Sequence, residues 1–277
     1  MHVTRRDILT SPATRGAAPL LALAAIAPGA ARAQYAPREV ASILAPSGTL
    51  RVAINYGNPV LAQRDPATGT PHGISADLAH EIGRRLGLPI QFITYDAAGR
   101  VTDAGRQGAW DLCFLAIDPV RAQGIRFTAP YVVIEGTYLV AEGSPVRSIE
   151  DVDRPGTRIS VGRGSAYDLY LTRELRQAQL VRVGTSNEAV EVFRRDGLEV
   201  AAGVKQPLID YAAANPGFRV IPGRFMVIEQ AVGIPQEREA ALPWLRAFVE
   251  EMKASGFIAR GLEASGQRSA SVAPPAS

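Results

Sequence analysis

Short apolar runs alternate along this chain with amphipathic stretches, which is the pattern of strands and helices arranged in layers. The apolar runs have strand length and contain many Val, Ile and Leu residues. We expect strands at 48–54, 90–95, 112–116, 137–140, 158–162, 200–204 and 231–234. Amphipathic segments between several of these runs predict an α/β fold with helices on the faces of a sheet.

Start and stop signals locate the expected helices. Ser75 is expected to cap a helix that has one apolar face and ends at Gly87. Ser165 and Thr185 each stand before a polar first turn, as a helix-capping residue does. A further helix should carry the apolar residues from 242 to 252 on one face and end at Gly256. The tail from 266 to 277 has few large apolar residues and is expected to be disordered.

The N-terminus has the features of an export signal. The sequence TRRDIL at positions 4–9 contains an arginine pair, and an alanine-rich apolar run follows at 17–28. Ala31-Arg32-Ala33 then forms a small-x-small cleavage pattern. We therefore interpret 1–33 as a signal peptide of the twin-arginine type, with the general secretory route as the alternative. An uncleaved, anchoring N-terminal helix is a further reading of the same run.

Removing this signal changes the charge of the protein. The whole chain has 30 basic residues (Lys and Arg) and 27 acidic residues. Residues 1–33 contain four arginines and one aspartate, so the remainder has 26 of each sign and no net charge. A neutral mature chain argues against nucleic acid as a partner, because such binding needs a basic face.

The remaining chemistry-bearing residues indicate neither a metal site nor a bound cofactor. Cys113 is the single cysteine and lies in an apolar strand pattern, so we expect a buried thiol. The histidines, His2, His72 and His80, are scattered along the chain. There is no glycine-rich phosphate loop and no G-x-S-x-G motif.

The most informative motif runs from Trp110 to Tyr131. It consists of Trp110-Asp111, an apolar strand, the loop Pro119-Val120-Arg121 and the sequence FTAPY at 127–131. Together with LRVAIN at 50–55 and GISADLA at 73–79, it resembles the periplasmic solute-binding proteins of ABC importers for polar amino acids, family 3. The resemblance covers about 48 to 262.

This resemblance implies a two-lobed periplasmic binding protein fold of type II with two hinge strands. The first lobe would be discontinuous, at 48–141 and 227–265, and the second lobe would be 142–226, with 34–47 as an N-terminal extension. The implied protein is a periplasmic monomer without enzymatic activity. It would bind an amino acid or a related carboxylate in the cleft, close by hinge motion and deliver the solute to membrane permease subunits.

In the first lobe, the resemblance implies that Arg121 binds the carboxylate of the solute, since a guanidinium pairs bidentately with a carboxylate. Asn55 and Tyr56 follow the first strand, where open α/β sheets bind ligands. Tyr56 is a candidate wall of the site, or else ordinary surface packing. Asp118 precedes Pro119, so it either caps the turn or contacts the solute.

In the second lobe, Ser165 opens a helix whose start is suited to an anion, and Arg163 beside it adds positive charge. The family commonly has an aspartate for the solute ammonium where this chain has Lys205. We therefore expect either another carboxylate, Glu135 or Glu229, to replace that aspartate, or a solute without an ammonium group.

Two other functions are compatible with the resemblance. Cyclohexadienyl dehydratases are periplasmic enzymes of the same fold, and in that case Arg121 and Lys205 would bind carboxylates while Glu135 acts as the general acid. A detached sensor domain that signals through a separate receptor is the third interpretation.

Overall fold

The computed structural model describes residues 37–267 and 269–276, so the expected signal peptide lies outside the described residues. A ten-stranded sheet runs through the described chain in the order β4-β1-β5-β11-β6-β9-β7-β8, and β10 and β12 pair with β6 beside this path. The strands are β1 Leu50–Asn55, β4 Ile90–Tyr95, β5 Leu112–Ala116, β6 Ile125–Ala141, β7 Arg158–Gly162, β8 Gln179–Val183, β9 Val200–Val204, β10 Phe218–Val220, β11 Met226–Pro235 and β12 Ser271–Val272. A separate hairpin joins β2 Gln63–Arg64 to β3 Pro71–His72.

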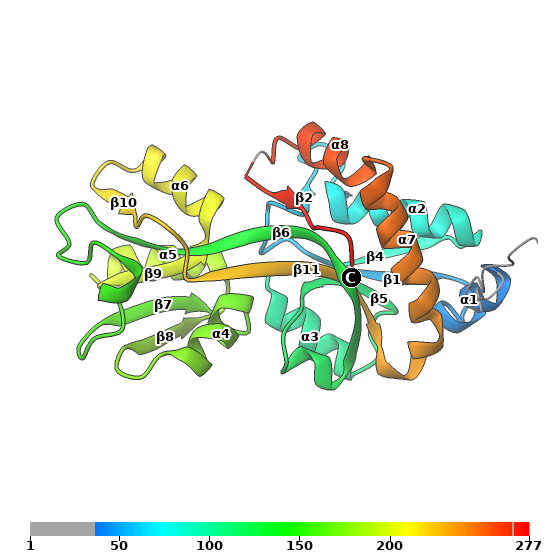
Figure 1. Ribbon diagram of the computed structural model, residues 1–277, viewed down its shortest axis with the longest axis horizontal. Coiled ribbons are helices and arrows are strands. Elements are labelled where there is room, and N and C mark those ends of the chain that lie inside the picture. The colour runs from blue at the N-terminus through cyan, green and yellow to red at the C-terminus, as the bar shows by residue number, and fades with distance from the viewer. Residues whose placement is uncertain (1–36, 268, 277) are drawn as a thin grey trace, which may run out of the picture. The chain divides into compact units, whose positions relative to one another are not determined.

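Two long antiparallel strands, β6 and β11, connect the two halves of this sheet (Figure 1). On one side β11 pairs with β5, which pairs with β1. On the other side the second half of β6 pairs with β9, which pairs with β7. We call the half with β1, β4 and β5 lobe 1 and the half with β7, β8 and β9 lobe 2, so β6 and β11 are the two hinge strands.

Within each lobe the strands pair in parallel, as β1 does with β4 and β7 with β8. Parallel strands are apolar along most of their length because helices cover both of their faces. All five residues of β5 are buried, as are four of the five residues of β9. The helices are α1 Pro37–Leu44, α2 Ile74–Leu86, α3 Ala98–Arg106, α4 Ala166–Glu174, α5 Ser186–Arg195, α6 Lys205–Ala214, α7 Leu242–Ala254 and α8 Phe257–Ala264. Three 3₁₀ turns are η1 Arg121–Gln123, η2 Ile149–Asp151 and η3 Gln236–Ala241.

Several local expectations are confirmed. Gly87 ends α2 in the left-handed conformation with φ of 66°. The hydroxyl oxygens of Ser165 and Thr185 accept hydrogen bonds from the backbone N–H groups three residues on, so both residues cap helices. Cys113 is fully buried, and its burial raises the pKa of the thiol.

Other expectations are wrong. Ser75 does not cap α2, because that helix begins at Ile74 and the Ser75 hydroxyl is 3.1 Å from the hydroxyl of buried Tyr131. The helix expected to end at Gly256 does end there, as α7, but a second helix, α8, begins directly after Gly256 and was not predicted. The tail is not disordered throughout: Ser271–Val272 forms β12 and pairs with β6, and Ala273 is 3% exposed. Backbone pairing with a long hinge strand, rather than apolar content, orders this segment.

Candidate functional site

A small cavity of about 30 Å³ lies between the two lobes. Lobe 1 contributes the loop after β1 and the end of β5, lobe 2 contributes the starts of α4 and α5, and the hinge strand β11 closes one side. This location agrees with the rule that ligands bind beyond the carboxyl ends of parallel strands. The polar lining residues are Asn55, Asn58, Arg121, Ser165, Tyr167, Ser186 and Gln230.

Among the described residues of this lining, Arg121 is the single charged one, and it is 2% exposed. Its Nη1 donates to the carbonyl oxygen of Ala116 in lobe 1, and its Nη2 donates to that of Gly164 in lobe 2, both at 2.9 Å. Its Nε–H has no acceptor among the residues that the structure describes. A buried N–H of a cation without a partner is destabilising, so this atom is suited to a carboxylate brought by a ligand.

Burial lowers the pKa of the Arg121 guanidinium to about 10, and the negative charge of Asp118 offsets part of this effect. Asp118 itself is 4% exposed and makes two other interactions. One oxygen accepts from the backbone N–H of Val120 at 2.8 Å, and the other accepts from Arg173 of α4 at 2.9 Å. Asp118 therefore caps the turn before η1 and forms an ion pair between the lobes.

The lobes also touch through their backbones beside Arg121. A methyl group on Gly99, in α3, would come within 2.7 Å of the carbonyl oxygen of Arg163. Gly164 has φ of 69°, which favours glycine at this turn. Together with the Arg121 and Asp118 contacts, this close approach defines a closed arrangement of the cleft.

The start of α4 forms the lobe 2 side of the cavity. The Ser165 hydroxyl accepts from the backbone N–H of Asp168 at 3.0 Å, and Ser165 is 6% exposed. Asp168 is not in the described lining of the cavity, and its oxygens accept from the N–H of Gly164 and from Arg182, both at 2.8 Å. The cavity therefore meets the positive end of α4 without a carboxylate in between.

The loop after β1 forms the lobe 1 side. Asn55 lines the cavity, and its Oδ1 accepts from the N–H of Gly57 at 2.9 Å. Asn58 also lines it, with its Oδ1 unpartnered and the residue 7% exposed. Tyr56 is not in the lining: the Arg64 guanidinium lies 4.8 Å from its ring centre, and burial raises its pKa.

Lys205 and Glu135 bind each other instead of lining the cavity. The Lys205 Nζ is 2.7 Å from one Glu135 oxygen, and Arg224 is 2.5 Å from the other. The hydrogen bonds from Lys205 and then Arg224 lower the pKa of Glu135 below its usual value. The other suggested carboxylate, Glu229, is exposed on β11 and is not in the lining either.

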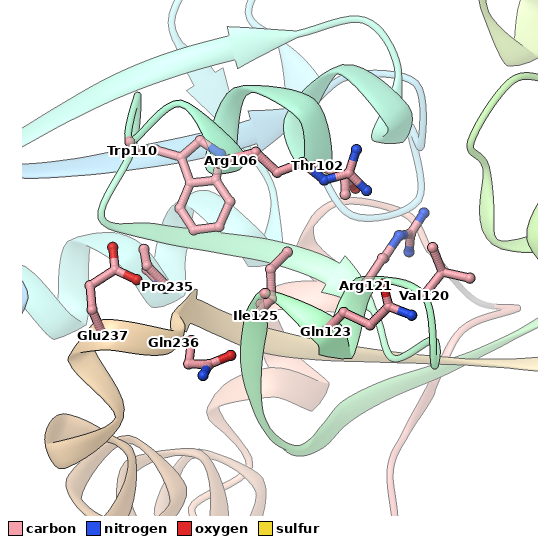
Figure 2. A pocket seen from close by; sticks show the side chains of 13 residues that line it. Thr102, Arg106, Trp110, Val120, Arg121, Gln123, Ile125, Pro235, Gln236 and Glu237 are labelled. Carbon is pink, nitrogen blue, oxygen red and sulfur yellow. The ribbon is translucent and has the colours of Figure 1, made fainter.

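Arg163 is exposed and faces a different pocket, of about 500 Å³, on the outer side of the contact between α3 and the start of α4. A further pocket, of about 560 Å³, lies beside α3 in lobe 1 and is larger than the cavity between the lobes. Figure 2 shows Arg121 and Val120 at one end of it and Trp110 and Glu237 at the other. Its lining does not include the start of α4, so this pocket does not lie in the cleft between the two lobes.

The structure thus brings three predicted residues, Asn55, Arg121 and Ser165, to one cavity. It does not bring Tyr56, Asp118, Glu135, Arg163 and Lys205 into that lining. Four further polar residues line the cavity and were not among the predicted site residues: Asn58, Tyr167, Ser186 and Gln230. The capping residues were available signals for two of them, because Tyr167 stands two positions after Ser165 and Ser186 stands directly after Thr185. The Tyr167 hydroxyl donates to the Ser186 hydroxyl at 2.6 Å.

In the part of the chain that the structure describes, no cluster of three or more histidine, cysteine or carboxylate side chains could hold a metal ion. None of the described helices has the length and apolar character needed to cross a membrane.

Solved structures with the same fold include a mutant of ArgBP from T. maritima (19% identity, TM-score 0.70, covering 83% of this chain and 100% of that chain). A solute receptor for L-cysteine of Neisseria gonorrhoeae is also similar (22% identity, TM-score 0.68, covering 83% of this chain and 92% of that chain). A third similar structure is an ancestral amino acid-binding protein, a precursor of cyclohexadienyl dehydratase (21% identity, TM-score 0.67, covering 82% of this chain and 98% of that chain).

No curated protein matches the chain significantly. The family model of the bacterial extracellular solute-binding proteins, family 3, matches residues 50–264. This match spans both lobes and both hinge strands. The protein therefore belongs to the bacterial extracellular solute-binding proteins of family 3.

Proposed function

We propose that this protein binds the carboxylate of a small organic solute between its lobes and delivers the solute to the permease of an ABC importer. The observation that carries the proposal is the buried Arg121 guanidinium, whose Nε–H has no acceptor and which lines the cavity between the lobes. The start of α4 lies across the same cavity and adds backbone N–H groups of a helix terminus. ArgBP and the solute receptor for L-cysteine share this fold, which supports a small polar solute for this protein as well.

A binding protein fits the cavity better than a dehydratase does. Among the described residues that line it, Arg121 and Tyr167 are the two that titrate, and burial raises the pKa of Tyr167. The suggested general acid, Glu135, lies outside the lining and is held ionised by two cations. General acid catalysis needs a free protonated group within hydrogen-bond reach of the substrate: Glu135 is ionised and outside the lining, and the Tyr167 hydroxyl already donates to Ser186.

Two measurements on the purified protein test the binding function. Native mass spectrometry is expected to detect a co-purified organic solute. Small-angle X-ray scattering is expected to give a smaller radius of gyration with solute than after its removal, because the lobes close about the hinge strands. The absence of any bound solute, together with a scattering profile that no added solute changes, would contradict the proposal.

We further propose that the protein acts in the periplasm after export by the twin-arginine route. If so, Arg5→Lys combined with Arg6→Lys should leave an unprocessed precursor inside the cell, because that route is read from the arginine pair. Immunoblotting of cell fractions measures this, with Arg15→Lys as the matched control in the same segment. Normal processing of the double variant would indicate the general secretory route instead.

A further inference from the structure

The cavity between the lobes is lined by two residues that each have a buried polar atom without a partner among the described residues. One atom is a donor, the Nε–H of Arg121, and the other is an acceptor, the Oδ1 of Asn58. Arg121 is 2% exposed and Asn58 is 7% exposed, so both are largely shielded from bulk water. A buried polar atom without a hydrogen bond is destabilising, and a ligand that supplies both missing partners removes this penalty.

The donor and the acceptor belong to lobe 1, and one small group can meet both. Asn58 lies in the loop after β1, and Arg121 lies in η1 after β5. A cavity of about 30 Å³ holds roughly two waters, which is close to the space that one carboxylate and one ammonium group fill. An α-amino acid carries these two groups on a single carbon. Its carboxylate accepts from Arg121, and its ammonium, which has only donors, is complementary to an amide oxygen.

The other side-chain oxygens near the cavity are less suited to an ammonium group. Those of Asn55, Ser165 and Ser186 each accept a hydrogen bond from within the protein. The carboxylates first considered for a solute ammonium, Glu135 and Glu229, lie outside the described lining. The buried acceptor that the lining leaves without a partner is therefore the neutral amide of Asn58 and not a carboxylate.

We propose that Asn58 binds the α-ammonium group of an amino acid whose carboxylate binds Arg121. This inference rests on the proposed binding function and names the residue that recognises the amino group of the solute. A neutral amide suffices because the carboxylate of the amino acid lies next to its own ammonium group and offsets part of its charge. The amide oxygen then supplies a hydrogen bond that a buried ammonium group needs.

A comparison of solutes tests whether the protein recognises an amino group. Thermal unfolding of the purified protein with each of the common L-amino acids identifies the one that stabilises it most. Calorimetry then compares this amino acid with two analogues, which carry a hydroxyl group or a hydrogen atom in place of the α-ammonium group. The amino acid is expected to bind roughly tenfold or more tightly than the hydrogen analogue, with the hydroxyl analogue between them, because a hydroxyl also donates to an amide oxygen. Equal binding of the amino acid and the hydrogen analogue, or binding of none of the amino acids, would overturn the inference.

Removing the amide of Asn58 tests where the ammonium group binds. Asn58→Leu keeps a similar side-chain size but cannot accept a hydrogen bond. It is expected to weaken the amino acid roughly tenfold or more and the hydrogen analogue less than about threefold, so the preference for the amino acid largely disappears. The melting temperature of the unliganded variant is expected not to fall, because the lost Oδ1 has no partner among the described residues. A folded variant that kept the wild-type preference would contradict the inference, and Asn58→Ala repeats the test with a smaller side chain.

Gln230→Leu is the matched control within the cavity. Gln230 lies on β11, is 5% exposed and is not left with a fully buried, unpartnered atom. Any loss of affinity in this variant is expected to be similar for the amino acid and the hydrogen analogue, so the preference stays within about threefold of the wild-type value. If Gln230→Leu abolished the preference and Asn58→Leu did not, the ammonium group would bind at Gln230 and the inference would be wrong. Asn215→Leu, at the end of α6 and outside the lining, is expected to bind both solutes as the wild type does.

The failure of this inference is distinguishable from a failure of the binding function. If a solute co-purifies or an amino acid binds, but the Asn58 variants keep the wild-type preference, the role of Asn58 is wrong and the binding function stands. If no amino acid binds, no solute co-purifies and scattering shows no closure, both are wrong.

Discussion

Replacing Arg121 by glutamine is expected to weaken solute binding by about 2–5 kcal/mol, or roughly 30- to 4000-fold. The variant leaves the carboxylate of the solute buried beside the start of α4 without its cation. It also removes the guanidinium that joins the carbonyl groups of Ala116 and Gly164 across the cleft. Isothermal titration calorimetry with the co-purified solute measures the loss.

The unliganded Arg121→Gln variant should remain folded, because the wild-type guanidinium is a buried cation that burial already disfavours. Thermal unfolding is expected to show that ligand no longer raises the melting temperature of the variant. Arg246→Gln is the control, since Arg246 is an exposed arginine on α7 in lobe 1. If the Arg121→Gln variant bound the solute with wild-type affinity, the carboxylate of the solute would not bind at Arg121 in this cavity.

Replacing Asp111 by alanine is expected to destabilise the protein by about 3 kcal/mol, because it leaves two arginines without their shared carboxylate. Asp111 is 1% exposed. One of its oxygens is 2.6 Å from Arg51 and 2.7 Å from Arg238, and the other accepts from the backbone N–H of Arg51 at 2.8 Å. It thus joins β1, the start of β5 and η3. This expected destabilisation is at the low end of the range for a buried ion pair, because the Arg51 side chain is 31% exposed.

Urea unfolding followed by circular dichroism measures this change as a lower midpoint with an unchanged slope. Asp103→Ala is the matched control, because the Asp103–Arg106 pair is exposed and should contribute less than about 1 kcal/mol. Equal midpoints for the two variants would show that burial does not strengthen the Asp111 cluster. Solute affinity should stay near the wild-type value in both folded variants, since Asp111 lies outside the cavity lining.

Sequence signals predicted the structure correctly where it depends on interactions between residues close together in the chain. The left-handed Gly87 ends α2, and the hydroxyls of Ser165 and Thr185 cap their helices, because each effect depends on a few neighbouring residues. The strands at 90–95, 112–116, 158–162 and 200–204 were predicted at their true bounds for the same reason, whereas 137–140 and 231–234 are only parts of the long strands β6 and β11. Ser75 misled because its hydroxyl bonds a tyrosine 56 positions away rather than the start of its own helix.

Contacts between distant segments were not readable from the sequence. Lys205 and Glu135 are 70 positions apart, and no spacing rule shows that they pair. The strand β12 forms because β6 offers backbone hydrogen bonds to it, which the polar composition of the tail does not reveal. A pocket of about 280 Å³ next to the cavity likewise depends on how α5, β9 and α6 approach the loop after β1.

The sequence by itself determined the α/β class, the family and the arginine expected to hold a carboxylate, because periodicity, capping and the motif around Arg121 are written in consecutive residues. Tertiary structure decided which charges face the solute. It paired Asp118 with Arg173 and Lys205 with Glu135, and among the described residues it left one N–H of the buried Arg121 without a partner. A charge acts on a ligand through its distance, its burial and its other partners, and those three quantities exist only once the lobes have folded together.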